Sequence, residues 1–169
     1  MKKITEKTLK LLDGREEILH DSFQITDHDF ELKLSKPMGE EIASLFLYYL
    51  GKDGKIPCLV LSVQNTNFMG YFVKINDIHL RRGLESRNGI GSQILKYMLE
   101  KLITSNFSFI FGEVKPDTSI ITLYGLIKFY EKNGFKIKYT SKSGYPITYK
   151  ILTKSPELTI NIQNFINDL

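Results

Sequence analysis

The stretch from residue 75 to residue 114 constrains the fold of this chain more than any other. An apolar run at 75–80 precedes the glycine-containing segment 86–92, and apolar side chains then recur at helical spacing: Ile94, Leu95, Met98, Leu99 and Leu102. This order predicts a strand, a loop and a helix over about 91–104. The next apolar run, 107–114, is expected to lie parallel to the first strand, because a helix crossover connects them.

The loop that opens this helix predicts a site for an anion. Gly89 and Gly91 let the backbone approach a ligand closely. The first N–H groups of a helix lie unpaired at the positive end of its dipole. Together these features suit a diphosphate. The alternative, which the glycine spacing alone does not exclude, is an ordinary turn before a helix.

A second informative segment lies near the end of the chain. Leu123, Leu126, Ile127 and Tyr130 fall at helical spacing, and Gly134 follows. The pattern predicts a helix over about 119–132, stopped by the glycine and followed by a new strand. A last hairpin is expected from 135–140 and 148–152, turned at 143–146.

The rest of the chain is predicted to be mostly antiparallel sheet. Alternating or continuous apolar residues predict strands at 30–34, 42–50, 56–63, 68–73 and 75–80, with a turn at 51–54. Asp13 and Gly14 signal a turn that suits either a hairpin or two short helices. The tail from residue 156 predicts a short helix. We therefore expect a single domain over 1–169, with a variable N-terminal segment at 1–29 and a C-terminal tail at 156–169.

The two signature segments, in this order, resemble those of the GNAT superfamily, the acetyl-CoA-dependent N-acetyltransferases. Gly89 and Gly91 match the coenzyme-binding motif, although Ser86 stands where that motif has Gln or Arg, and an arginine follows one place later. The sequence from Tyr130 to Phe135 resembles the family's Tyr-Glu-Lys-x-Gly-Phe ending, although Leu123 stands where many members carry asparagine.

The resemblance spans roughly residues 68–152 and implies an α/β (α+β) fold of GNAT type. That fold has a mixed, mostly antiparallel sheet with a central parallel strand pair flanked by helices. Members of the family usually carry one or two helices between their first two strands, where only about 37–42 is available here. The identity of the acceptor is therefore left open.

The resemblance also implies a coenzyme site. Acetyl-CoA would be the cosubstrate, held by the end of the strand and by the loop after it: Leu80, Arg81, Arg82, Arg87, Asn88, Gly89, Ile90, Gly91 and Ser92. Tyr130 would protonate the departing thiolate. The alternative interpretation is that Tyr130 is only a core aromatic residue at helical spacing.

The general base is a choice between two carboxylates. Asp77 and His79 share one face of the strand at 75–80, while Glu113 lies near the end of its parallel neighbour, where the two strands should splay. Glu113 interrupts an apolar run, and burying a charge without a partner is costly. We favour Glu113 over Asp77; a solvent-exposed strand end or a relay of water molecules are the alternatives.

Composition bounds the remaining possibilities. The chain has 169 residues, 42% of them hydrophobic, enough for one core. No apolar run approaches a membrane span, no signal core follows the first residues, and the one cysteine, Cys58, cannot form an internal disulfide. We therefore expect a cytoplasmic protein without membrane association. Its three histidines are scattered without ligand spacing, so we expect no metal.

Charge is unevenly distributed along the chain. Residues 1–42 carry a net charge of −3 within a total of +4, so the remainder, which holds the expected coenzyme site, is basic. This distribution suits a polyanionic coenzyme. The lysines form no basic stripe with interleaved aromatics, which disfavours nucleic acid as a partner.

The leading hypothesis is an N-acetyltransferase that acts on a primary amine of a small molecule or protein. The alternative is a non-catalytic module that keeps the fold to bind or sense acyl-CoA. A dinucleotide-dependent oxidoreductase is disfavoured because Ile94 stands at the third glycine position. The amine acceptor is the expected partner, and a homodimer is kept open.

Overall fold

The structure is a computed structural model that describes residues 14–35, 42–79, 89–117 and 121–169. A 3-10 turn, η1 (Arg15–Glu17), comes first. The strands are β1 (Asp21–Ile25), β2 (His28–Ser35), β3 (Ala43–Gly51), β4 (Gly54–Thr66), β5 (Gly70–Ile78), β6 (Phe109–Glu113), β7 (Lys136–Lys138) and β8 (Ile147–Ile151). The helices are α2 (Ile90–Thr104), α3 (Leu123–Lys132) and α4 (Pro156–Asp168).

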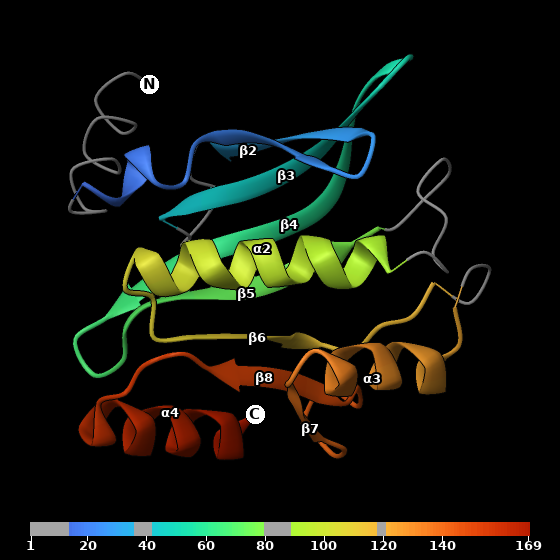
Figure 1. Cartoon of the computed structure of the whole chain (residues 1–169). Helices are drawn as coiled ribbons and strands as arrows, with labels where there is room; N and C mark the ends of the chain where they lie inside the picture. The colour runs from blue at the N-terminus through green and yellow to red at the C-terminus, as the bar shows by residue number, and fades with distance from the viewer. Residues whose placement is uncertain (1–13, 36–41, 80–88, 118–120) are drawn as a thin grey trace.

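The strands form one eight-stranded sheet with the order β1-β2-β3-β4-β5-β6-β8-β7 (Figure 1). Every neighbouring pair is antiparallel except β5 and β6, which are parallel and connected through α2. The predicted fold class is therefore confirmed: a mostly antiparallel sheet with one central parallel pair and flanking helices. β8 lies between β6 and β7, so the last hairpin joins the sheet through its second strand.

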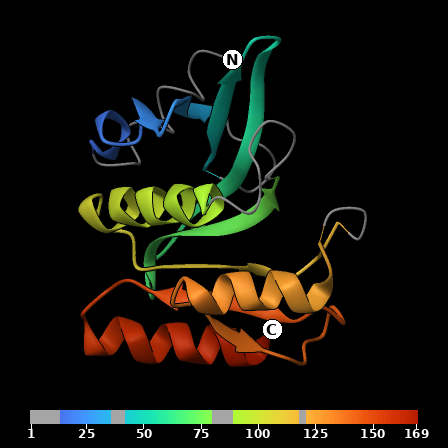
Figure 2. The ribbon, with the colours of Figure 1, turned by 45° about the vertical axis from the view of Figure 1, so that its right-hand side comes forward.

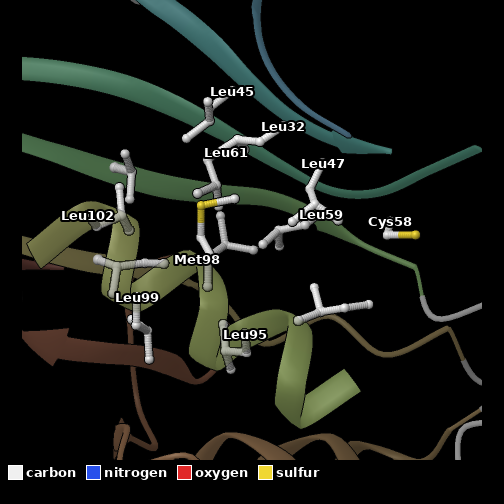
Figure 3. Close-up of a cluster of buried hydrophobic side chains, with 14 of the residues drawn as sticks. Leu32, Leu45, Leu47, Cys58, Leu59, Leu61, Leu95, Met98, Leu99 and Leu102 are labelled. Carbon is white, nitrogen blue, oxygen red and sulfur yellow. The ribbon is translucent and has the colours of Figure 1, made fainter. Parts of the chain in front are cut away.

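One face of the sheet packs against α2 and α3. Leu45 and Leu47 of β3 and Leu59 and Leu61 of β4 point toward α2, whose side chains Leu95, Met98, Leu99 and Leu102 meet them (Figure 3). The apolar residues of α2 recur every three or four positions, so one stripe of the helix is buried. Leu126, Ile127 and Tyr130 extend this core from α3. We call this side of the sheet the inner face.

The other side of the sheet, the outer face, is covered in part by α4. Phe72 of β5 and Phe109 and Phe111 of β6 alternate with inner-face residues, and they pack with Ile162 and Ile166 of α4 in a second core. Figure 2 shows α3 and α4 on opposite sides of β7 and β8. The predicted C-terminal helix is thus present, and it seals the outer face at β5, β6 and β8.

The predicted element boundaries need three corrections. The runs 68–73 and 75–80 were expected as two strands, but β5 is continuous through Lys74, whose single polar side chain fits the alternation of one strand. The helix expected from 119 begins at Leu123, where the Thr122 side chain accepts a hydrogen bond from the Gly125 N–H at 3.0 Å. Near Gly14 the structure has η1, and the first hairpin turns later, at Thr26.

The first strand is fastened to α2 by a polar and aromatic cluster. The ring of Phe23 stacks on that of Tyr97, with centroids 3.6 Å apart. The Tyr97 hydroxyl donates a hydrogen bond to the Asp21 carboxylate, and Lys101 Nζ lies 3.0 Å from the same carboxylate oxygen. The hydrogen bond from Tyr97 and the charge of Lys101 hold the pKa of Asp21 below its usual 3.8.

Replacing Tyr97 with Phe should lower the free energy of unfolding by about 1 kcal/mol at neutral pH, because one partly buried, charge-assisted hydrogen bond is lost. The folded pKa of Asp21 lies below its unfolded value, so this contribution is present above about pH 4 and disappears as the pH falls further. Urea unfolding of both proteins between pH 3 and 7 measures it. Tyr139→Phe, at an exposed position, is the control and should leave the free energy of unfolding unchanged. If wild type and Tyr97→Phe differ in stability by the same amount at pH 3 as at pH 7, the assignment to Asp21 is contradicted.

Candidate active site

The two parallel strands separate soon after they meet. Pairing between β5 and β6 covers Val73–Ile75 on one strand and Ile110–Gly112 on the other. At the last pair the strands approach so closely that a Cβ atom on Gly112 would lie 2.8 Å from Cβ of Ile75. Only glycine fits there. Beyond this pair no described residue pairs with the edge of β5 that faces β6, so from Asn76 onward this edge has no strand partner in the described part of the chain.

A β-bulge lies at the same point on the other side of β5. Leu61 of β4 pairs with Ile75, and the adjacent Val60 pairs with Asp77, so Asn76 is the extra residue. The Asn76 side-chain amide donates a hydrogen bond to the Ser62 hydroxyl, which fixes the bulge. A bulge bends its strand and changes the direction of the following side chains. Here it turns Asn76 and Asp77 together toward the outer face.

The separation of the strands leaves a cavity of about 440 Å³. Its walls come from β5, from the end of β6 and from α3: Lys74, Ile75, Asn76, Asp77, Ile78, Glu113, Lys115, Leu126 and Tyr130. This volume lies within the range of small-molecule sites. The cavity thus brings together the three residues predicted to be catalytic, which lie far apart in the sequence.

Tyr130 is the most buried of these three residues. Only 1% of its surface is exposed, and its ring packs against Phe135, with centroids 5.3 Å apart. Burial raises the pKa of the hydroxyl above its usual 10, and the negative charge of Asp77 raises it further. The hydroxyl therefore keeps its proton at neutral pH. A protonated hydroxyl at a cavity wall can donate a hydrogen bond to an atom that gains negative charge.

Each candidate base has a basic side chain beside it. Glu113 forms an ion pair with Lys115 at 2.8 Å, and Lys115 also lies over the ring of Tyr145. Asp77 Oδ2 lies 2.5 Å from Nε2 of His79. About a quarter of the Glu113 side chain and about half of the Asp77 side chain are exposed, so both carboxylates are accessible from the cavity. The ion pair with Lys115 gives Glu113 a structural reason to tolerate its apolar surroundings.

The first turn of α2 has the features expected of an anion site. Gly89, the residue before the helix, has a φ of +71°, and the helix begins without a side-chain cap or an acidic residue in its first turn. Among the described residues, none accepts a hydrogen bond from the N–H groups of Ile90, Gly91 or Ser92. N–H groups in the first turn of a helix lie at the positive end of its dipole, which favours an anion there.

A hydrogen bond connects this turn to the cavity wall. The Asn133 side-chain amide donates to the Ser92 hydroxyl at 3.2 Å and to the carbonyl of Phe129 at 2.8 Å. Asn133 lies three residues after Tyr130, at the end of α3. The start of α2 and the turn that carries Tyr130 are consequently held side by side.

The predicted residues fall into two groups. Asp77, Glu113 and Tyr130 share the cavity, and Gly89, Ile90, Gly91 and Ser92 form the start of α2. The remaining predicted coenzyme residues, Leu80, Arg81, Arg82, Arg87 and Asn88, lie outside the described residues. Among the described residues no group of three or more His, Cys, Asp or Glu side chains could hold a metal ion. No helix in the described part of the chain is long and apolar enough to cross a membrane.

Sequence reasoning missed Asn76 and Lys115. The adjacent polar residues Asn76 and Asp77 break the alternation of β5, and such a break indicates a bulge. That signal was available. Lys115 follows the strand end, and nothing in the sequence distinguishes it from the other lysines.

Comparison with known proteins gives similarity at the level of the backbone. No family model matches the chain, and no curated protein matches it. Among solved structures, an acetyltransferase of the GNAT family from Staphylococcus aureus matches at 14% identity with a TM-score of 0.47, over 65% of this chain and 69% of that one. GNAT is the family that the sequence resembles.

Two further solved structures show the range of the matches. Naa50 of Arabidopsis thaliana, in complex with a bisubstrate analogue, matches at 20% identity and a TM-score of 0.42, over 63% of this chain and 71% of its own. A protein of unknown function from Aquifex aeolicus matches at 16% identity and a TM-score of 0.47, over 98% of this chain and 86% of its own.

Proposed function

We propose that this protein is an acetyl-CoA-dependent N-acetyltransferase that acts on a primary amine. The observation that carries the proposal is the convergence of Asp77, Glu113 and Tyr130 on one cavity, at the point where a parallel strand pair separates. An uncapped helix start lies beside that cavity. Acetyl-CoA would supply an activated acetyl thioester. Residues of the chain would bind the coenzyme, assist the departure of the thiolate and remove a proton from the amine.

In this proposal the coenzyme is held by backbone groups. The N–H groups of Ile90, Gly91 and Ser92 would bind the diphosphate at the positive end of the α2 dipole. The open edge of β5 after Ile75 would pair with the extended amide arm as an added strand would. The basic balance of the chain after residue 42 favours a polyanion. Leu80, Arg81, Arg82, Arg87 and Asn88 complete the proposed site.

Tyr130 would assist the departure of the thiolate. Its hydroxyl is protonated at neutral pH and the residue lines the cavity, so we assign to this hydroxyl a hydrogen bond to the sulfur that gains charge. Burial and the charge of Asp77 raise the pKa of this hydroxyl. Complete transfer of its proton to the thiolate is therefore unfavourable unless another group returns a proton to the Tyr130 oxygen. Hydrogen-bond donation is therefore the main contribution that we assign to Tyr130.

A carboxylate would remove a proton from the attacking amine. Glu113 remains our choice because it lies at the end of β6, lines the cavity and is partly exposed. Asp77 is the alternative, and its contact with His79 gives a second route by which a proton could leave. A relay of water molecules without a single base is the third possibility.

A non-catalytic acyl-CoA-binding module is the second candidate function. Leu123, where many GNAT sequences carry asparagine, is the first residue of α3 and is 41% exposed. An apolar residue at that place contributes no hydrogen bond to a coenzyme. Binding of acetyl-CoA without turnover of any amine would favour this candidate over the enzyme.

Replacing Gly91 with Val should abolish acetyl-CoA binding, because Gly91 is buried in the first turn of α2 and a branched side chain would displace the N–H groups from the ligand. In the wild type, ligand at a hundred times its dissociation constant should stabilise the fold by about 2.7 kcal/mol. Calorimetry and thermal shift measure both effects. The melting temperature without ligand reports any loss of folding, and unchanged affinity in a folded variant would refute the proposed anion site.

The variant Tyr130→Phe should lower kcat by about 100-fold, toward the lower end of the range for one proton donor, and leave acetyl-CoA binding nearly unchanged. The reason is that the ring still packs while the hydroxyl is lost. A thiol-release assay with a panel of amines measures turnover. Tyr124→Phe, on the exposed side of the same helix, is the matched control. Full turnover in Tyr130→Phe would show that Tyr130 is only a core aromatic.

The pH profile of kcat/KM should identify the base. A base must be deprotonated to work, so activity falls on the acidic side, and replacing the base removes that acidic limb. We expect Glu113→Gln to remove it and the control Glu131→Gln, on the surface of α3, to keep it. If Asp77→Asn removes the limb instead, Asp77 is the base. A limb that survives both variants would indicate a water relay.

A further inference from the structure

A second cavity lies on the outer face of the sheet, away from α4. It has a volume of about 410 Å³ and is lined by Lys33, Ser35, Phe46, Tyr48 and Lys55. These residues belong to β2, β3 and β4, and the alternation of the strands places Lys33, Phe46 and Tyr48 opposite the inner-face leucines. The catalytic cavity and its residues have no lining residue in common with it.

The chemistry of this second cavity suits a negatively charged group beside an apolar one. The rings of Phe46 and Tyr48 are stacked, with centroids 5.5 Å apart and planes within 9°. Lys55 lies over the Tyr48 ring, but it also pairs with Glu31 at 3.1 Å, so its charge is partly neutralised. Within the described part of the chain, Lys33 has no acidic partner. Of the two lysines that line this cavity, Lys33 is the one that no described carboxylate neutralises.

The register of the sheet connects the two cavities. Lys33 pairs with Phe46, Phe46 with Val60, and Val60 with Asp77, so these four residues form one row across β2, β3, β4 and β5 on the outer face. Neighbouring strands lie about 4.8 Å apart, so Asp77 is about 10 Å from Phe46 and about 14 Å from Lys33 along the row. The row thus carries a negative charge at one end, two apolar residues in the middle and a positive charge at the other end.

We propose that this row is the acceptor-binding surface, and that the acceptor is a primary amine joined by an apolar spacer to a carboxylate or phosphate about 10–14 Å away. The amine would lie in the first cavity near Asp77, the spacer on Val60 and Phe46, and the anion at Lys33. Opposite charges at the two ends fix the direction in which such a molecule binds. This inference rests on the proposed acetyl transfer and adds the class of acceptor.

Two series of acceptors test the proposal. The first is a set of ω-amino acids of increasing chain length, each compared with its primary amide. The second is a set of short peptides with a free amino terminus and Asp or Asn at the third or fourth position, which an extended chain places in the same range. At the matching length the charged member should have a kcat/KM about two- to fivefold higher, the range expected for one exposed ion pair. Higher kcat/KM values for the ω-amino acids would identify a small molecule as the acceptor, and higher values for the peptides would identify a peptide.

Charge reversal provides the decisive comparison. Lys33→Glu should remove or invert the preference for the anionic member, whereas Lys136→Glu, at the opposite edge of the sheet, should leave it unchanged. If amines are acetylated and Lys33→Glu keeps the same preference, the acceptor assignment is wrong while the proposed function stands.

A binding measurement separates this inference from catalysis. If no amine is acetylated, calorimetry with the N-acetylated ω-amino acid and its amide still reports on the row. Tighter binding of the carboxylate, lost in Lys33→Glu, would support the surface even though the proposed enzyme activity had failed. Equal binding of the two compounds by the wild type would overturn the assignment.

Discussion

The close approach of Ile75 to Gly112 is the constraint on which the site depends. A parallel pair normally continues for several residues, because each added pair gives further hydrogen bonds. Here it ends at a glycine, and the bulge at Asn76 bends β5 at the same level. The two strands are thus held in contact at one point and diverge beyond it. The cavity, the open edge of β5 and the positions of Asp77 and Glu113 all follow from that divergence.

The divergence is stable because both sides of it are packed. On the inner face, α2 and α3 bury the side chains that precede the separation, and Tyr130 fills the space beside Phe135. On the outer face, α4 presses Phe72, Phe109 and Phe111 into a second core. Tyr130 belongs to the inner core, where burial raises the pKa of its hydroxyl, and the negative charge of Asp77 raises it further.

The sequence predicted the central part of this structure because its signals are local. Helical spacing up to Leu102 and the glycines before it gave α2 within one residue, and the crossover rule gave the parallel direction of β6. The first hairpin and the continuity of β5 through Lys74 were not predicted, because they depend on which strands pair. The Lys115 ion pair was missed for the same reason: sequence spacing does not show what a strand end meets in space.

The charges of the sheet follow a pattern that no local signal contains. Register alone brings Lys33, Phe46, Val60 and Asp77 into one row, although the four residues come from four strands. On β2, β3 and β4 the inner-face side chains beside this row are leucines of the inner core, whereas Lys33, Phe46 and Val60 lie on the outer face and do not belong to that core. Substitutions on the outer face of β2, β3 and β4 therefore leave the inner core and the buried Tyr130 in place. The proposed acceptor surface thus lies where a change of side chain disturbs the inner core least.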